Sequence, residues 1–275
     1  MLQGSKEAQR KWWLYNRFKY LDSKYNAGDS LTDVITIRAY AKNDITITPY
    51  ADIYASIKYG SSLISERASR NIPIVLDCPL DNLNDTEIYI YSASRLTDIG
   101  DLSGLKMGYG NFSYATKLQT LKIGDADSQY NNTNLVNLYL GNNTLLKTLD
   151  VRNCSGLGTG TQKTVDLSQC SNIENVYFEG TNILGVSLPN GGMLKKLHLP
   201  GTITNLVLSN QTNLTELVCS DYSHISTFSV TNPSNAINIR NIMMQLPTNA
   251  RIRLFNFDWE VQNYSSISSF FEYIS

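Results

Sequence analysis

The stretch "NVYFEGTNILGVSLPNGGMLKKLHLPGTITNLVL", residues 175–208, decides the fold because its apolar residues follow neither strand alternation nor a helical stripe. The pattern is apolar-x-x-apolar-x-apolar. It occurs six times in succession, at Ile173/Val176/Phe178, Ile183/Val186/Leu188, Leu194/Leu197/Leu199, Ile203/Leu206/Leu208, Leu214/Leu217/Cys219 and Ile225/Phe228/Val230. Successive copies start 9 to 11 residues apart, and alternate copies start 20 to 22 residues apart. This spacing predicts a solenoid whose coils each carry two short extended segments.

Stacking explains the pattern physically. The last two apolar residues of each copy point the same way, into the coil, while the residue between them faces water. One coil of about twenty residues cannot bury such a face alone, so coils must stack into a continuous core. Further copies lie upstream, but insertions at "GDADSQYNN" and "GLGTGTQ" loosen their spacing, so we assign the register only from residue 173. These copies are Leu118/Leu121/Ile123, Leu135/Leu138/Leu140, Leu146/Leu149/Val151 and a degenerate Val165/Leu167. We expect the solenoid over residues 95–240.

The composition and net charge of the chain restrict the classes of partner that we expect. The chain has 275 residues, a formal net charge of −1 and a pI near 6.1, so we expect no nucleic-acid partner. Charged residues make up only 17%, below the roughly 25% of typical soluble domains, which favours a cell exterior or particle surface. The sequence has no apolar run of about 18 residues, and its start lacks the apolar core of a secretory signal. We therefore expect neither a membrane span nor a signal peptide.

Residues 1–30 predict a basic amphipathic helix. Leu14, Phe18, Leu21 and Tyr25 recur at helical spacing, and lysine and arginine dominate the opposite face. We favour docking on its own domain or a neighbouring subunit over membrane-surface or nucleic-acid binding. The residues expected to carry this assembly role are Trp12, Trp13, Arg17 and Phe18.

Residues 31–94 alternate between apolar and polar positions. The alternating runs are Ile35/Ile37/Ala39, Ile45/Ile47, Ile53/Ala55/Ile57/Tyr59, Ile72/Ile74/Leu76 and Ile88/Ile90. Turn residues separate them, so we predict a small antiparallel β-sandwich, followed by "RLTDIGDLSGL" as the cap of the solenoid. At the other end, residues 241–275 predict a last strand in "ARIRLFNFDWEV" and the start of a helix in "SSISSFFEYIS". We infer that the native polypeptide continues beyond Ser275. The predicted fold class is mainly β: an N-terminal helix, a small antiparallel sandwich and a leucine-rich-repeat solenoid.

The sequence offers few groups for catalysis. The four cysteines, at 78, 154, 170 and 219, form no CxxC pair, and we expect them to be structural. His198 falls on a sheet surface and His224 in a turn, with no local triad arrangement. "GLGTG" lacks the context of a phosphate loop, and "DADSQ" lacks the glycine and glutamate of a calcium loop. We therefore expect no enzyme, no cofactor and no metal.

The outward residues of one strand series predict a binding surface. Stacked coils would align them in columns about 4.8 Å apart, giving a mixed aromatic and polar strip suited to glycan or protein. The alternative interpretation is an ordinary exposed sheet face, since tyrosine favours strands in any case. The predicted residues are Tyr139, Asn175, Tyr177, Glu179, Lys196, His198 and Glu216.

Two resemblances add to this reading. The repeats, as in "TNLTELVCSD" and "CSNIENVYFEG", resemble leucine-rich repeats of gut bacterial surface proteins over residues 96–232. The whole chain is similar to structural proteins of tailed bacteriophages, including crAss-like gut phages. The segments that carry this resemblance are "SKEAQRKWWLYNRFKYLDSKYNAGD", "ITITPYADIYASIKYGS", "NDTEIYIYSASRLTDIGDLSGLK", "ATKLQTLKIG" and "RIRLFNFDWEV".

The phage resemblance implies a virion component of the tail, collar or muzzle region, built in multiple copies. Its partners would be other virion proteins and itself, with contact to host-surface glycan or protein. The alternative is a leucine-rich-repeat adhesion module of a bacterium or prophage, located on the bacterial cell surface and binding protein or glycan. A tail-associated depolymerase is the third reading.

Overall fold

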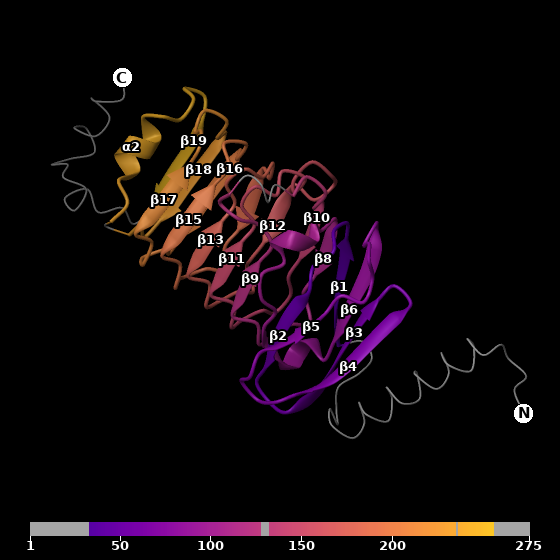
Figure 1. Ribbon diagram of the computed structural model, residues 1–275. Coiled ribbons are helices and arrows are strands. Elements are labelled where there is room, and N and C mark those ends of the chain that lie inside the picture. The colour runs from indigo at the N-terminus through magenta and orange to yellow at the C-terminus, as the bar shows by residue number, and fades with distance from the viewer. Residues whose placement is uncertain (1–32, 128–131, 235, 256–275) are drawn as a thin grey trace, which may run out of the picture.

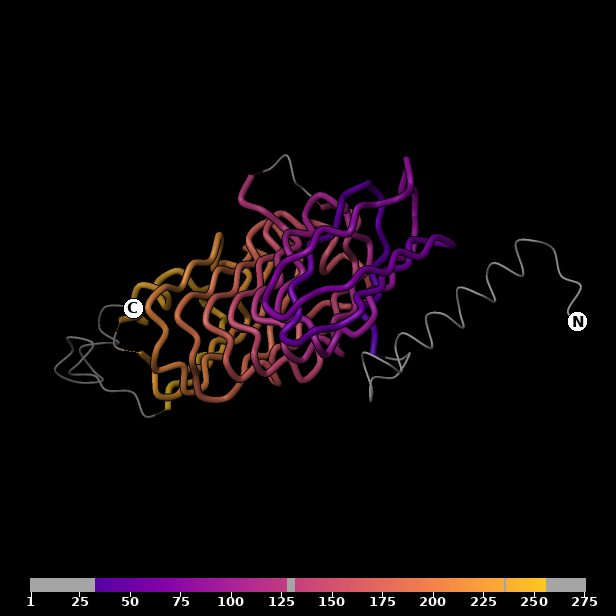
Figure 2. Tube along the Cα trace, turned by 60° about the horizontal axis from the view of Figure 1, so that its bottom comes forward, coloured from indigo at the N-terminus to yellow at the C-terminus, as the bar shows by residue number. Residues whose placement is uncertain are grey.

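The protein is mainly β, with N-terminal sheets that lead into a parallel β-solenoid (Figure 1). The computed structural model describes residues 33–127, 132–234 and 236–255. The coils stack along one long axis, and the Cα trace shows their repeating outline (Figure 2). This confirms the predicted class of fold at the level of a β-solenoid preceded by sheets.

Two parallel sheets form the walls of the solenoid. The front sheet, which faces the viewer in Figure 1, has the order β17-β15-β13-β11-β9, and the back sheet has the order β12-β14-β16-β18-β19. The front strands are β9 (Thr120–Lys122), β11 (Thr148–Asp150), β13 (Asn175–Tyr177), β15 (Lys196–Leu199) and β17 (Glu216–Cys219). The back strands are β12 (Thr164–Asp166), β14 (Gly185–Ser187), β16 (Asn205–Ser209), β18 (Thr227–Thr231) and β19 (Arg251–Phe255). Alternate copies of the apolar pattern therefore enter opposite sheets, as predicted.

The inward apolar residues form continuous rows. Strand register places five of them side by side in the front sheet: Leu121, Leu149, Val176, Leu197 and Leu217. The first four are fully buried, and Leu217 is half-buried on the last front strand. Residues 121, 149 and 176 lie 28 and 27 residues apart, against 21 and 20 for the next two steps. The upstream copies thus belong to the same stack, and their extra residues lie outside the strands.

The N-terminal region contains two sheets, with strand orders β10-β8-β1-β6-β3-β4 and β5-β2-β7. Their strands are β1 (Val34–Ala39), β2 (Ile45–Pro49), β3 (Ile53–Tyr59), β4 (Ser62–Ala68), β5 (Ile74–Leu76), β6 (Thr86–Tyr91), β7 (Leu96–Asp98), β8 (Tyr109–Asn111) and β10 (Asn137–Tyr139). Within residues 31–94 the paired strands are antiparallel, as expected. The Tyr59 hydroxyl donates to the Leu76 carbonyl across 3.3 Å and links the two sheets. The edge strand β4 was not predicted.

Both N-terminal sheets continue directly into the solenoid. β7 pairs antiparallel with β2, and just beyond it Asp101 bridges in parallel to Lys122 of β9. β8 pairs antiparallel with β1 on one side and parallel with β10 on the other. Two short 3-10 helices, Ala93–Arg95 and Ser103–Leu105, lie in this transition. The buried apolar residues of sheets and coils form one core, so the N-terminal sheets close that end of the solenoid.

A short helix, α2 (Ile239–Met243), follows the last full coil and was not predicted. The Asn238 side chain accepts the Asn241 backbone N–H at 3.0 Å and caps the first turn. Ile239, Ile242 and Met243 are buried in the core, so the helix covers apolar surface near the C-terminal end.

Several predictions fall outside the described residues. They are the helix over residues 1–30 with Trp12, Trp13, Arg17 and Phe18, and the helix start within residues 265–275. The predicted last strand is confirmed for Arg251–Phe255. In the described part of the chain, no helix is long and apolar enough to cross a membrane.

Candidate binding surface

The outward side of the front sheet carries two rows of aligned side chains, which we call the front face. Strand register places Thr120, Thr148, Asn175, Lys196 and Glu216 in one row. The second row contains Lys122, Asp150, Tyr177, His198 and Val218. These rows contain five of the seven residues predicted as a binding strip, and Glu179 joins them through its side chain.

His198 lies at the centre of this surface, between two carboxylates. Its Nε2 is 2.6 Å from Oε1 of Glu216, and its Nδ1 contacts the Glu179 carboxylate. The ring meets Tyr177 edge to face, with centroids 4.9 Å apart. Only 14% of the His198 side chain is exposed. Strands β13, β15 and β17 therefore hold this imidazole in one fixed orientation.

Glu216 links His198 to a lysine. Its Oε2 is 2.8 Å from Nζ of Lys196, on the neighbouring strand. The hydrogen bond from Lys196, followed by that from His198, lowers the pKa of the Glu216 carboxyl below its ordinary value. The same bond raises the pKa of the Lys196 ammonium. Lys196 and Glu216 thus place opposite charges on the adjacent strands β15 and β17.

The network extends beyond the predicted residues. Arg152 holds Asp150 with Nε–Oδ1 and Nη2–Oδ2 distances of 3.0 and 2.5 Å, and its guanidinium lies 4.9 Å from the Tyr177 ring centroid. Further along, Lys122 Nζ lies 2.7 Å from Asp101 and 2.5 Å from Asp125. Sequence reasoning missed these residues because the register was assigned only from residue 173. The signal was present, since Lys122 and Asp150 occupy the outward position of upstream copies.

Tyr139 corrects the predicted strip. It lies on β10, which pairs in parallel with β8 of the six-stranded sheet, away from the front sheet. Its ring packs against Tyr109, with centroids 5.7 Å apart. The reason is that successive copies of the apolar pattern alternate between the two walls of the solenoid. The copies at 118–123 and 146–151 enter the front sheet, so the copy between them, at 135–140, lies on the opposite wall.

The cysteines and the second histidine lie where the sequence suggested. Cys78, Cys154 and Cys170 are buried and Cys219 is half-buried, all as free thiols. Burial raises the pKa of the Cys154 thiol to about 12 and that of Cys170 to about 11, so both thiols are protonated at neutral pH. His224 is exposed and lies 3.3 Å from Asp221.

The two loop motifs have structural roles. Gly158 of "GLGTG" has φ +95°, and a Cβ there would lie 2.1 Å from the Asn182 carbonyl oxygen, so the glycine allows two coils to touch. Asp125 of "DADSQ" accepts the Asp127 N–H at 2.9 Å besides its contact with Lys122. No group of three or more potential metal ligands occurs in the described ranges.

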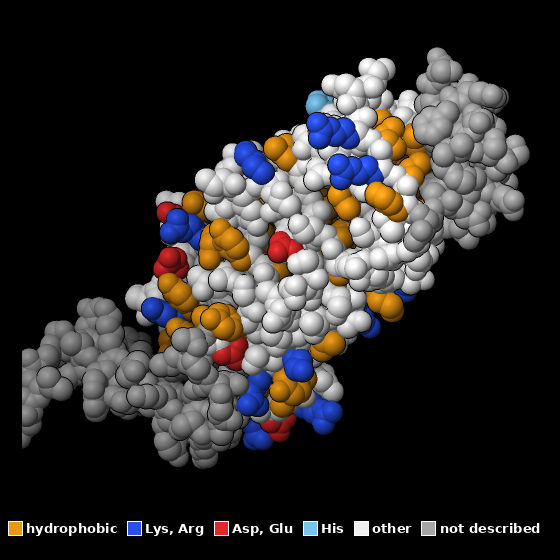
Figure 3. All heavy atoms as spheres, turned by 180° about the vertical axis from the view of Figure 1, so that it is seen from behind, with side chains coloured by type: hydrophobic (Ala, Val, Ile, Leu, Met, Phe, Trp, Pro, Cys, Tyr) orange, Lys and Arg blue, Asp and Glu red, His pale blue; other side chains and the backbone are white. Residues whose placement is uncertain are grey.

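The back face, the outward side of the back sheet, differs in chemistry. Its central strands present mostly hydroxyl and amide side chains, whereas the two edge strands add charge, with Asp166 on β12 and Arg251 and Arg253 on β19. Lysine and arginine side chains accordingly gather towards the C-terminal end of this side of the molecule (Figure 3). The outward residues of three successive strands are Gly185 and Ser187, then Asn205, Val207 and Ser209, then Thr227, Ser229 and Thr231.

Comparison with known proteins gives no relative. No family model matches this chain, and neither a curated protein nor a solved structure matches it. Function is therefore inferred from the sequence and from the geometry of the described residues.

Proposed function

We propose that this chain is a structural component of a tailed-phage virion, in the tail, collar or muzzle region, and that it acts through protein–protein assembly. The observation that carries this proposal is the front face: a sheet surface that presents fixed ion pairs, among them Arg152 with Asp150 near β11 and Lys196 with Glu216 on β15 and β17. Such a surface suits a partner with a complementary pattern of charge.

The charged side chains of the front face are already held in ion pairs before any partner binds, which supports selective recognition. Glu216 is held by Lys196 and His198, and Asp150 by Arg152, so little side-chain freedom is lost when a partner docks. Charged groups at an interface mainly set specificity and association rate, because like charges placed together exclude wrong partners. A multi-copy particle needs this property, since each subunit must choose one neighbour.

We further infer that the coils are leucine-rich repeats. Alternate copies recur every 20 to 22 residues with the apolar-x-x-apolar-x-apolar pattern, which lies at the short end of that repeat class. The N-terminal sheets would then be the β domain that precedes the repeats in the phage proteins that this chain resembles.

The remaining support comes from the surface and from the sequence resemblance. The hydroxyl and amide groups on the central strands of the back face suit a particle exterior, in line with the 17% of charged residues in the chain. The predicted helix with Trp12 and Trp13 would serve as an assembly element, and that role stays a prediction.

A second candidate is an adhesion module on a bacterial surface. The observation that favours it is the group of tyrosines on the outward side of the six-stranded sheet, which includes Tyr109 and Tyr139. Tyrosine and amide side chains are typical of surfaces that bind glycan or protein. Both candidates use the solenoid as a rigid support.

The deciding experiment is the identification of the chain's neighbours. Phage particles and bacterial envelopes from the same culture would be purified separately, treated with a lysine cross-linker and analysed by mass spectrometry. We expect peptides of this chain in the particles, with Lys195 or Lys196 cross-linked to a virion protein or a second copy. Recovery only from bacterial envelopes would replace the virion proposal with the adhesion module.

A matched pair of variants then tests the front face. Lys196→Glu places a like charge beside Glu216 and should abolish incorporation into particles or binding to the cross-linked partner. Lys58→Glu changes the same charge on β3 of the N-terminal sheet and should leave incorporation intact. Equal incorporation of both variants would show that the front face is not the assembly surface.

A further inference from the structure

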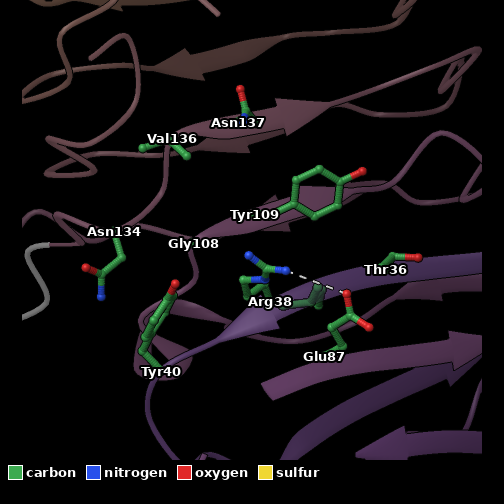
Figure 4. Close-up of a pocket in the computed structure, with 10 residues that line it drawn as sticks. Thr36, Arg38, Tyr40, Glu87, Gly108, Tyr109, Asn134, Val136 and Asn137 are labelled. Atoms are coloured by element: carbon green, nitrogen blue, oxygen red, sulfur yellow. Dashed lines mark ion pairs between the residues drawn. The ribbon is translucent and has the colours of Figure 1, made fainter. Parts of the chain in front are cut away.

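A cleft lies where the six-stranded sheet meets the first coils of the solenoid. It has a volume of about 510 Å³ and is bounded by β1, β6, β8 and β10 with the segment around residue 134 (Figure 4). This volume is within the range of small-molecule and cofactor sites. The cleft lies on a different sheet from the front face, so it is a separate candidate site.

Strand register builds the outward side of this sheet from two rows. Glu87, Arg38, Tyr109 and Asn137 lie side by side in the first row. The second row contains Tyr89, Thr36, Asn111 and Tyr139. Tyr40 adds another ring at the cleft wall. Four tyrosines therefore gather on one sheet face, and Tyr40 and Tyr139 are 36% and 43% exposed.

The backbone at the cleft is fixed by close packing. A Cβ at Gly108 would lie 2.6 Å from Cε2 of Tyr40, so this glycine makes room for the tyrosine ring. The Gly108 N–H donates to the Arg38 carbonyl at 2.8 Å, and the Gly108 carbonyl accepts the Val136 N–H at 3.1 Å. The wall that holds Tyr40 against the sheet is thus preformed, which lowers the entropic cost of binding a ligand.

Polar groups of both kinds line the same cleft. Arg38 lies 3.3 Å from Asp85 and 3.8 Å from Glu87, and 48% of its side chain is exposed. The Oδ1 atom of Asn137 is buried and has no hydrogen-bond partner among the described residues. A buried acceptor without a donor is unfavourable, so rotation of the Asn137 amide towards the cleft would let a ligand hydroxyl supply the hydrogen bond that the protein leaves unmade.

We propose that this cleft binds a neutral oligosaccharide. A sugar ring has an apolar C–H face that packs on tyrosine rings and hydroxyl groups that both donate and accept hydrogen bonds. Asn137 and Glu87 accept from those hydroxyls, and Arg38 donates to them. The guanidinium is already shared by two carboxylates, so an acidic sugar would meet more negative than positive charge. This proposal deepens the host-contact part of the proposed function.

The test uses the full 275-residue chain and a panel of tetrasaccharides. The neutral probes are maltotetraose, cellotetraose, mannotetraose and chitotetraose, and the acidic probe is tetragalacturonate. Binding is measured by saturation-transfer NMR and by titration. We expect at least one neutral probe to bind. Tyr109→Ala and Asn137→Ala should each weaken it by about tenfold, because each removes a contact on the ring or on a hydroxyl.

Tyr50→Ala is the matched control, since Tyr50 is 39% exposed next to β2 of the other N-terminal sheet. Its affinity should equal that of the unmodified chain. Thermal unfolding of each variant checks the fold, and Tyr109→Phe, which keeps the ring, should retain most of the affinity if Tyr109→Ala fails to fold.

Three outcomes would overturn the cleft proposal: no neutral probe binds, only the acidic probe binds, or the cleft variants bind as tightly as the control. These outcomes leave the assembly proposal untouched, because the cross-linking of particles does not depend on Tyr109 or Asn137. Conversely, if the chain binds glycan but is absent from phage particles, the cleft proposal is supported and the proposal of a virion component is wrong.

Discussion

The front and back faces of the solenoid share one core but differ in surface chemistry. On both sheets the inward positions are apolar and buried, as at Leu197 and Phe228. On the front sheet the outward positions of β13, β15 and β17 make ion pairs and aromatic contacts, whereas on the back sheet the central strands carry mainly hydroxyl groups, as at Thr227 and Ser229, and charge appears only on the edge strands β12 and β19. Stacking of the coils therefore requires apolar residues at the inward positions but places little constraint on the outward residues. Differences between the outward residues of the two faces are thus the better guide to function.

Neighbouring coils are also coupled differently on the two sides. Next to the back sheet, the Asn210 side-chain amide donates to Asn190 at 2.7 Å, and the Asn232 amide contacts Asn210 in turn. Neutral amides do not titrate, whereas the front face is coupled through the ion pair between Lys196 and Glu216. Coupling between coils should therefore depend on pH and salt in front and be nearly insensitive to both behind.

The largest effect is expected from breaking the shared core. Phe228→Ala should lower the free energy of unfolding by about 3–5 kcal/mol and Leu197→Ala by about 2–5 kcal/mol, since both side chains are fully buried. Val218→Ala, on the front face with 39% exposure, should cost less than about 0.5 kcal/mol. Chemical denaturation followed by circular dichroism measures all three. A core variant as stable as Val218→Ala would contradict the stacked core.

The next largest effect concerns the contact between coils at Gly158. Gly158→Ala should cost about 2–4 kcal/mol, because the new Cβ would lie 2.1 Å from the Asn182 carbonyl oxygen and the residue has φ +95°. Gly191→Ala is the matched control, with φ +84° and no atom within 4 Å of the added Cβ. It should cost about 1–2 kcal/mol through backbone strain alone. Equal losses of stability would show that the coils are not in contact at Gly158.

The apolar pattern was sufficient to predict the solenoid walls, because burial leaves little choice at inward positions. It did not predict β4, since Ser62–Ala68 lies at a sheet edge and is mostly polar. It also missed α2, which has only five residues and too little length to show a helical period.

The candidate sites were predicted less completely, for a topological reason. Because of the upstream insertions, the sequence spacing does not show to which wall of the solenoid each upstream copy belongs. The predicted binding strip therefore includes Tyr139, which lies on the other wall, and omits Asp150, which lies on the front face. The cleft joins Arg38 to Asn137, and no local pattern signals a contact between residues so far apart in sequence. Only the continuity of the six-stranded sheet with the first coils brings them together.

A smaller effect is expected from the ion pair between Asp150 and Arg152. Asp150→Asn keeps the size of the side chain but removes the charge that holds the Arg152 guanidinium through three hydrogen bonds, of 3.0, 3.2 and 2.5 Å. Because the Asp150 side chain is only 8% exposed, we expect a loss of about 2 kcal/mol in low salt. Ser229→Ala on the back face should cost less than about 0.5 kcal/mol. A loss as small as that of Ser229→Ala would contradict this difference between the faces.

The smallest effect, and the most direct probe of the front face, is the titration of Glu216. The hydrogen bond from Lys196, and then that from His198, lowers the pKa of this carboxyl, so Glu216 stabilises the fold at pH values above the ordinary glutamate pKa. That contribution is lost as the pH falls through the lowered pKa of the folded state. In Lys196→Met the pKa should rise, which carbon-detected NMR of the carboxyl measures directly. Lys195→Met is the matched control: Lys195 pairs with Glu174 at 2.7 Å, so this variant should raise the pKa of Glu174 and leave that of Glu216 unchanged. If both lysine variants shift Glu216 equally, its pKa reflects the general charge of the face, and the strand-to-strand pairing that distinguishes front from back is wrong.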